Sequence, residues 1–422
     1  MKRWAPIIAA LVRAPAAASP ALGPYLTDPR PDGMTVRFET ARPVSAEVRY
    51  ATGAEPERIA RSRTGTAHAV VLRDLRPATR YRYRVVLEGE PPGADLGFRT
   101  APPPGEPFSF VVMGDTRSAE ADHRAVLAQL AGEAPDLVLH TGDLVEDGAE
   151  EAGWKSFFDV EGPLLSRAPL LAAMGNHEAQ NQLGMQNFTR FFGIALQDGE
   201  MIHALTYGNT RFLVMDTNLI FFSLSGQTAW LERELQAAVT DPSIRHIFVM
   251  MHHGPYATGP HGGSRGVRAA WAPLFAAYGV EAVFSGHDHL YERLEQDGVR
   301  YFVSGGGGGP LYQKQTEPDP EDARASLYTE SVHHYVRVHV AGEHVELAAL
   351  RAEGSLIESV RWRLAERTVR PPPLQARAVA LRADVSGHAR WIAVGAAMVG
   401  IGLAVAIVGR RRRISAARQR GT

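Results

Sequence analysis

Four short polar blocks each follow a run of apolar residues, and this arrangement limits the folds open to the chain. The blocks are Gly114-Asp115, Gly142-Asp143, Gly175-Asn176-His177 and Gly286-His287-Asp288-His289, and His252 ends a further apolar run. Runs of this length and composition predict buried strands. Strand ends that meet at one edge of a sheet would bring the polar side chains together. Asp, Asn and His are the ligand types that hold hard or borderline divalent metals.

Composition places the chain among globular proteins and narrows the choice of metal ligands. With 422 residues, the chain is long enough for two or three domains. It contains no cysteine, which excludes disulfides, Fe–S clusters and thiolate zinc sites. A net charge of −1 gives no indication of a nucleic-acid partner.

The N-terminal residues 1–23 have the outline of a secretory signal. Lys2 and Arg3 precede the mostly apolar residues 4–12, and three alanines follow at 16–18. Pro6 interrupts the apolar run and Arg13 ends it early, so a disordered N-terminus is the alternative.

Residues 390–410 predict one transmembrane helix near the C-terminus. Residues 391–409 carry no charge and are long enough to cross a hydrocarbon core of about 30 Å. Arginines are concentrated in the following tail, 411–422, which predicts a cytoplasmic C-terminus and an extracytoplasmic main domain. A buried core helix is the alternative, and the Gly and Ala content would also suit helix–helix association within the membrane.

Two domains are expected before this segment. Residues 24–101 alternate with period two in several short stretches, including 34–38 and 46–50, and predict an all-β unit. Tyr81 and Tyr83 share one strand face after a proline-containing turn, which resembles a fibronectin type III-like sandwich. Strands and helices then interleave over 107–363, which predicts a layered α/β domain. Residues 364–389 look like an extended stalk.

The second domain is expected to contain three helices and a series of strands. The helices are predicted at 121–130, 226–239 and 267–278. Strands are predicted at 109–113, 137–140, 169–174, 211–215, 247–251 and 281–284, with later antiparallel strands at 299–303, 335–340 and 345–349.

The ordered polar blocks strongly resemble the calcineurin-like metallophosphoesterase superfamily. The β-rich unit before them and the glycine run at 305–309 resemble a bacterial branch related to purple acid phosphatases. The resemblance implies a four-layer αββα sandwich with two metal ions, which could be Fe, Mn or Zn. It implies metal-dependent hydrolysis of phosphate esters, either monoesters or diesters.

The resemblance also assigns roles to individual residues. Asp143 would bridge the two ions. Asp115 and His289 would bind the first ion, and Asn176, His252 and His287 would bind the second. His177 would contact a phosphate oxygen or protonate the leaving group. His261 lies where the family often has a second substrate-facing histidine.

Two residues depart from the family pattern at the first ion. Glu146 stands where purple acid phosphatases have the iron-binding tyrosine, and Arg117 stands where other branches have a histidine. Glu146 could approach the metal, Arg117 and Glu146 could pair, or Arg117 could clamp the substrate phosphate. We favour the last two hypotheses. His123 is a more distant candidate for the missing ligand.

Other histidines match no motif, and an ordinary structural role is the simpler interpretation for them. They are His246, His253, His333, His334 and His344. The glycine run is expected to be a loop that passes close to the metal site. The predicted function is therefore that of a membrane-anchored ectoenzyme acting on phosphate esters. The alternative is a tethered binding or adhesion protein with a degraded catalytic domain.

Overall fold

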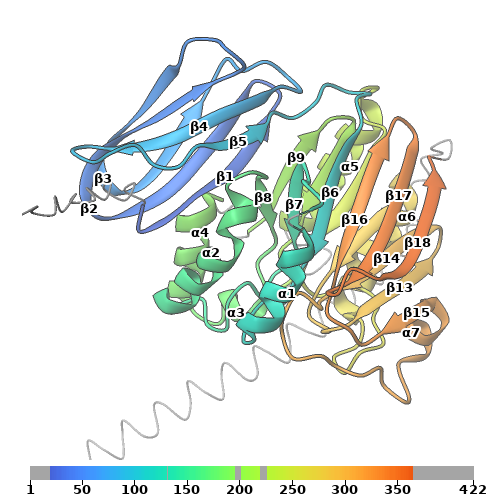
Figure 1. The fold of residues 1–422 in the computed structure, drawn as a ribbon. Coiled ribbons are helices and arrows are strands. Elements are labelled where there is room, and N and C mark those ends of the chain that lie inside the picture. Colours follow the sequence, from blue (N-terminus) through green and yellow to red (C-terminus); the bar gives the residue numbers. More distant parts are fainter. Residues whose placement is uncertain (1–19, 131, 195–200, 219–225, 365–422) are drawn as a thin grey trace, which may run out of the picture.

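The computed structural model describes residues 20–130, 132–194, 201–218 and 226–364. Their strands form three sheets, of which one lies N-terminal and two form a second, larger unit (Figure 1). The predicted signal segment up to residue 19 and the predicted stalk, membrane helix and tail from residue 365 onward lie outside the described residues. Within the described residues, no helix is long and apolar enough to cross a membrane.

The N-terminal sheet has five strands in the order β1-β2-β4-β5, with β3 also paired to β2. They are β1 (Leu22–Arg30), β2 (Gly33–Ala51), β3 (Arg58–Leu72), β4 (Arg80–Leu87) and β5 (Leu96–Arg99). The two alternating stretches 34–38 and 46–50 both lie in β2, which is continuous. Its register with β3 shifts between Glu39 and Ala46, and such bulges bend a strand without ending it.

Two tyrosines on the inner face of β4 connect the N-terminal sheet to its surroundings. The backbone N–H of Arg76 donates to the hydroxyl of Tyr81 at 2.9 Å and so closes the turn before β4. The hydroxyl of Tyr83 donates to the carbonyl of Ser166, in the second unit, at 2.8 Å. This buried hydrogen bond attaches the sheet to the second unit.

The second unit contains a six-stranded and a seven-stranded sheet. The first has the order β18-β17-β16-β6-β7-β8 and the second β15-β13-β14-β12-β11-β10-β9. The strands of the first are β6 (Phe108–Met113), β7 (Leu137–His140), β8 (Leu170–Ala172), β16 (His334–Ala341), β17 (His344–Arg351) and β18 (Leu356–Arg363). Those of the second are β9 (His203–Tyr207), β10 (Thr210–Val214), β11 (His246–Met250), β12 (Ala282–Ser285), β13 (Tyr291–Gln296), β14 (Val299–Ser304) and β15 (Ser326–Glu330).

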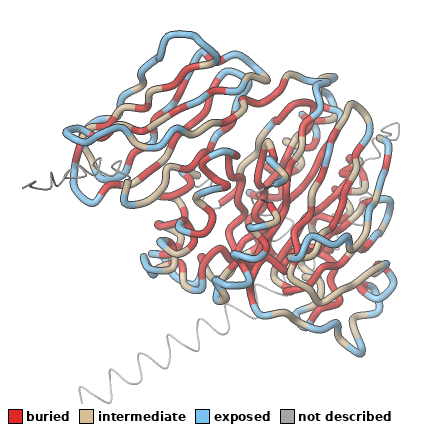
Figure 2. Tube along the Cα trace, in the orientation of Figure 1, coloured by how far each residue is buried: buried red, intermediate tan, exposed pale blue. Residues whose placement is uncertain are grey.

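The sheets lie face to face, and helices cover their outer faces. An aromatic core that includes Phe110, Phe248 and Phe284 fills the space between the sheets. Figure 2 shows the buried residues concentrated along these strands. The helices are α1 (Glu120–Leu130), α2 (Glu151–Leu165), α3 (Asn176–Ala179), α4 (Gln182–Phe192), α5 (Gly226–Thr240), α6 (Arg265–Tyr278) and α7 (Pro320–Ala325). The second unit thus forms a mixed α/β fold in α-β-β-α layers.

Several elements of the second unit were not predicted from the sequence, namely α2, α3, α4, α7, β9, β13, β15 and β18. Helix α2 was not predicted, because Gly153, Gly162 and Pro163 weaken its helical signal, yet the packing of Trp154 and Phe157 stabilises it. Strand β14 was predicted among antiparallel strands. It pairs antiparallel with β13 but parallel with β12, because the hairpin β13–β14 reverses the chain twice after β12.

Candidate metal centre

The polar blocks meet where the carboxyl ends of the central strands of both sheets come together. Strands β6, β7 and β8 are parallel, as are β10, β11 and β12, so their following loops emerge at one end of each sheet. Two contacts join the loops, the first within the six-stranded sheet and the second between the two sheets. Asp115 N–H donates to the carbonyl of Gly142 at 2.9 Å, and His252 Nδ1 lies 2.9 Å from the carbonyl of Thr141.

Three candidate ligands have left-handed backbone conformations. The φ angles are 57° at Asp115, 55° at Asp143 and 71° at His287. Such angles are uncommon outside glycine and cluster at functional sites, where the surrounding structure enforces them. Gly142 has a φ of 101°, and a Cβ there would lie 2.8 Å from His252 Nδ1. A side chain at this position would push the two sheets' loops apart.

One group of candidate ligands gathers around His252. Its Nδ1–H donates to the Thr141 carbonyl, which leaves Nε2 facing the site. Nε2 lies 3.0 Å from Asn176 Oδ1 and 3.4 Å from Asp143 Oδ1. The ring of His287 lies 5.0 Å from that of His252. With Asp143, these are the four residues that the family resemblance assigns to the second ion, and the structure brings them together.

His253 also belongs to this group, although its sequence context suggested an ordinary structural role. Its Nδ1 lies 2.8 Å from the hydroxyl of Thr217, and its ring lies 4.3 Å from that of His287. Ligand atoms of His252, His253 and His287 all lie within 4.8 Å of one another. The His-His doublet was the signal that could have included it.

These imidazoles are neutral and can act as ligands. Burial, followed by repulsion from neighbouring histidines, lowers the pKa of His252 and of His287 far below its usual range. Burial lowers the pKa of His253 to about 4. A neutral ring keeps a lone pair for metal coordination.

The second group contains Asp115, His289 and the other oxygen of Asp143. His289 Nδ1–H donates to the carbonyl of Pro310 at 2.7 Å, and Nε2 lies 3.4 Å from Asp115 Oδ1. The ring of Tyr312 stacks on His289 at 4.1 Å. Burial, opposed by His289, raises the pKa of Asp115 to about 7. The residues assigned to the first ion therefore also lie together.

Arg117 lies within this second group. Its Nε donates to Asp143 Oδ2 at 3.2 Å, and Nη1 donates to Glu146 Oε2 at 3.0 Å. Its side chain is 13% exposed, whereas that of Glu146 is 61% exposed. Of the three arrangements open from the sequence, the structure has the Arg117–Glu146 pair.

His123 does not take part in the site. Its Nε2 lies 2.7 Å from Oε1 of Glu161 on α2, and both side chains are buried. The hypothesis that His123 supplies the missing ligand is therefore wrong, because helix α1 turns the ring toward α2.

The glycine run 305–309 is a tight loop against the metal-site backbone. Gly307 N–H donates to the carbonyl of Gly114 at 2.9 Å, and Gly309 N–H donates to that of Asp115 at 2.7 Å. A Cβ on Gly307 would lie 2.4 Å from the Gly114 carbonyl oxygen. These N–H groups are already bonded, so the loop provides close approach, as expected, and those two groups are not free to bind phosphate.

Two predicted substrate-facing histidines border the site. His177 Nδ1–H donates to the carbonyl of Glu146 at 2.5 Å, and its Nε2 lies 3.8 Å from Asp143 Oδ2. The ring of His261 lies 4.1 Å from that of His287. A cavity of about 430 Å³ opens here. Its polar lining includes Asn176, Thr217, Asn218, His253, His261 and His287.

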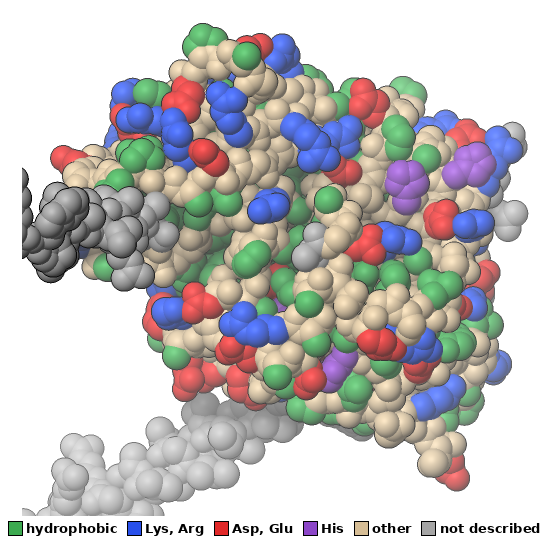
Figure 3. All heavy atoms as spheres, in the orientation of Figure 1, with side chains coloured by type: hydrophobic (Ala, Val, Ile, Leu, Met, Phe, Trp, Pro, Cys, Tyr) green, Lys and Arg blue, Asp and Glu red, His purple; other side chains and the backbone are tan. Residues whose placement is uncertain are grey.

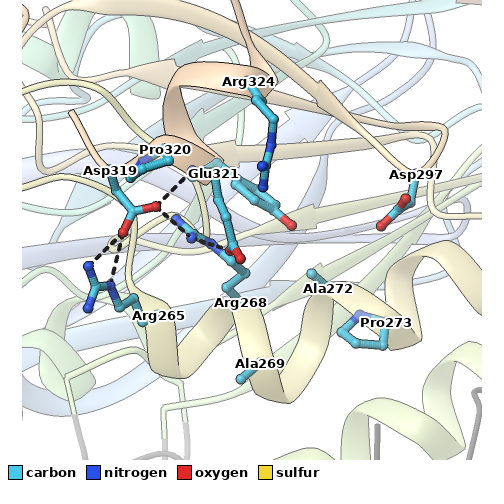
Figure 4. Close-up of a pocket in the computed structure, with 11 residues that line it drawn as sticks. Arg265, Arg268, Ala269, Ala272, Pro273, Asp297, Asp319, Pro320, Glu321 and Arg324 are labelled. Carbon is cyan, nitrogen blue, oxygen red and sulfur yellow. Dashed lines mark hydrogen bonds and ion pairs between the residues drawn. The ribbon is translucent and has the colours of Figure 1, made fainter. Parts of the chain in front are cut away.

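A second cavity, of about 710 Å³, lies between α6 and α7 (Figure 4). Arg265 and Arg268 point toward Asp319 and Glu321, with a shortest N–O distance of 2.6 Å in each pair. The arginines are therefore engaged in structural ion pairs.

On the face of the molecule seen in Figure 3, acidic and basic side chains are interspersed.

Comparison with known proteins identifies the domain. Residues 108–291 match the family model described as calcineurin-like phosphoesterase. These residues form a calcineurin-like metallophosphoesterase domain. The match runs from β6 to the start of β13 and contains every candidate ligand.

Relatives of the metallophosphoesterase domain include purple acid phosphatases. An uncharacterized protein of Mycobacterium tuberculosis is 29% identical over 297 residues, covering 61% of this chain and 54% of the relative. Purple acid phosphatase 21 of Arabidopsis thaliana is 25% identical over 266 residues, covering 60% of this chain and 56% of the relative. The chain thus spans about half the length of these relatives.

The fold is shared with a solved plant enzyme. The structure of a purple acid phosphatase from yellow lupin (Lupinus luteus) seeds aligns with a TM-score of 0.72 at 19% identity. The alignment covers 81% of this chain and 74% of the lupin chain. At this identity the likeness establishes the fold alone.

The metallophosphoesterase family uses a dinuclear metal centre, and the two groups of side chains fit such a centre unequally. Around His252, one carboxylate oxygen, one amide oxygen and neutral imidazole nitrogens converge, which suits Mn²⁺, Zn²⁺ or Fe²⁺. Around His289, the guanidinium of Arg117 lies among the donors. The first of these sets fits a metal ion, and the second does not.

Proposed function

We propose that the chain is a metal-dependent hydrolase of phosphate esters, resembling the purple acid phosphatases. The observation that carries the proposal is the convergence of His252 Nε2 with Asn176 Oδ1 and Asp143 Oδ1, at 3.0 and 3.4 Å. This donor set lies beside a polar cavity large enough for a small phosphate ester. A bound divalent ion there supplies a Lewis acid that polarises phosphate oxygens and lowers the pKa of water.

Residues of the chain position the substrate and move its proton. The Glu146 carbonyl fixes His177 with its proton on Nδ1, so Nε2 is the atom that faces the site. From there His177 either contacts a phosphate oxygen or exchanges a proton with the leaving group. The cavity beside His253 and His261 is lined by amides and hydroxyls, which suits a polar leaving group.

The test is turnover of p-nitrophenyl phosphate and bis-p-nitrophenyl phosphate by the purified chain with Mn²⁺, Zn²⁺ or Fe²⁺. Asp143→Asn removes the charge between the two groups of donors, and we expect activity to fall by at least about 100-fold, or about 2.7 kcal/mol of transition-state stabilisation. Asp159→Asn, on the exposed side of α2, is the matched control and should remain active. Wild-type activity no higher than that of Asp143→Asn with every metal would favour a tethered binding or adhesion protein.

The cellular location is part of the proposal. The predicted membrane helix at 390–410 and the arginines after it would anchor the chain with its metallophosphoesterase domain outside the cytoplasm. The N-terminal sheet would be a fibronectin type III-like domain, as the corner formed by Tyr81 suggests. Protease treatment of intact cells should remove the domain. Protection of the domain until the cells are lysed would contradict this location.

A further inference from the structure

The guanidinium of Arg117 contacts the atoms that the family pattern assigns to the first metal ion. Nε donates to Asp143 Oδ2 at 3.2 Å, and Nη2 lies 3.5 Å from His289 Nε2. The same His289 nitrogen also lies 3.4 Å from Asp115 Oδ1. A carboxylate oxygen and an imidazole nitrogen on which an ion would depend therefore both face the arginine.

Metal and guanidinium would compete for the same donor atoms. A metal ion binds carboxylate oxygen or imidazole nitrogen at roughly 2.0–2.2 Å, along a lone pair. The N–H groups of Arg117 point at those same atoms. A permanently charged guanidinium also repels a divalent cation held a few ångströms away.

Arg117 supplies the positive charge beside Asp115 and Asp143 that a second metal ion would otherwise supply. Asp115 and Asp143 are 0% and 1% exposed, so their charges are separated from water. Carboxylate oxygens of the two residues lie within 4.8 Å of each other, and a compensating positive charge stabilises such a buried pair. Arg117 supplies that charge together with directed hydrogen bonds.

Hydrogen bonds to Glu146 and Ser118 fix the position of the Arg117 guanidinium. Nη1 donates to Glu146 Oε2 at 3.0 Å and to the hydroxyl of Ser118 at 3.1 Å. Ser118 in turn donates to Glu146. Both residues that depart from the family pattern, Arg117 and Glu146, thus form one structural unit.

We propose that this chain binds a single metal ion, at Asp143, Asn176, His252 and His287, and that the guanidinium of Arg117 takes the place of the other ion. Asp143 still connects the two positions, with Oδ1 facing His252 and Oδ2 facing Arg117. The inference rests on the proposed function only for the presence of the bound ion. It assigns the second positive charge of the centre to the polypeptide itself.

The experiment measures metal content in the absence of substrate. The full chain is loaded with Mn²⁺, freed of excess ion by dialysis and analysed for metal per chain, and its electron paramagnetic resonance spectrum is recorded. We expect one ion per wild-type chain and the hyperfine pattern of an isolated Mn²⁺. Two ions per wild-type chain, with the pattern of an exchange-coupled pair, would overturn the proposal.

Two variants test the role of Arg117. Arg117→His replaces the cation with a potential ligand, and we expect two ions per chain and a coupled spectrum. Glu146→Gln keeps the guanidinium against Asp143 and should remain at one ion. A single ion in folded Arg117→His, checked by its thermal unfolding, would show that Arg117 is not what excludes the other ion and would also overturn the proposal. Turnover is measured separately, so a chain that binds one ion but hydrolyses no ester contradicts only the proposed function.

Discussion

The buried carboxylate of Glu178 accepts a hydrogen bond from the backbone N–H of Asp143 at 3.0 Å. The same carboxylate accepts from Val145 N–H at 3.1 Å and from Gly175 N–H at 2.9 Å. Glu178 thereby ties the loop after β7 to the loop after β8, which carry Asp143 and Asn176. Glu178 thus fixes the positions of these two candidate ligands through backbone hydrogen bonds.

Glu178→Gln should weaken metal binding. The carboxamide that replaces the carboxylate would point its own N–H group at backbone N–H groups. At least one of the three hydrogen bonds would therefore be lost, and the loops would separate. Supporting residues of this kind are worth about 10–100-fold in metal affinity. Competition with a chelator measures the effect. Glu120→Gln, at an exposed position on α1, serves as control, and equal affinities in the two variants would contradict this role of Glu178.

The chain loaded with iron should be colourless. The colour of purple acid phosphatases requires a tyrosine on ferric iron, and Glu146 occupies that place in this sequence. Tyr312 stacks its ring on His289 at an interplanar angle of 7°, an arrangement typical of packing. An absorption spectrum of the iron-loaded chain provides the measurement. A strong visible band that disappears in Tyr312→Phe would show that Tyr312 replaces the missing ligand.

Tyr83→Phe should destabilise the junction between the N-terminal sheet and the metallophosphoesterase domain. The buried Tyr83 hydroxyl donates to the Ser166 carbonyl at 2.8 Å, and its removal leaves that carbonyl without this donor. The expected loss in free energy of unfolding is about 1–3 kcal/mol, measured by urea denaturation. Tyr328→Phe, whose hydroxyl bonds to Glu330 near the surface, is the control, with a loss below about 1 kcal/mol. Equal losses would show that the junction contributes little.

Acid should destabilise the fold partly through His334. Burial lowers the pKa of His334 to about 4, below the value near 6.5 in the unfolded chain. The unfolded state therefore binds a proton first, so stability is complete above about pH 6.5 and falls toward pH 4, by about 1.4 kcal/mol per pH unit. The pH dependence of unfolding should be shallower in His334→Asn, since Asn does not titrate. An unchanged slope would mean that His334 is protonated with little cost in the fold.

Much of the site can be inferred from the sequence because its ligands lie at strand ends. Each apolar run predicts a strand, and the polar residue after it marks the edge where parallel strands finish. The contacts of His253 with Thr217 and of His123 with Glu161 could not be inferred in this way. These side chains meet residues more than 30 positions away, and such contacts leave no periodic signal.

The sequence by itself determined the chemistry available to this protein: carboxylate, amide and imidazole ligands at strand ends, with no cysteine and with Arg117 and Glu146 in place of the usual residues. Only the tertiary structure decided where the guanidinium points. A residue's type and spacing specify what a side chain can bind, whereas the packing of distant loops specifies which partner it meets. Here that packing directs Arg117 to Asp143 and Glu146, and it leaves the His252 cluster as the proposed metal site.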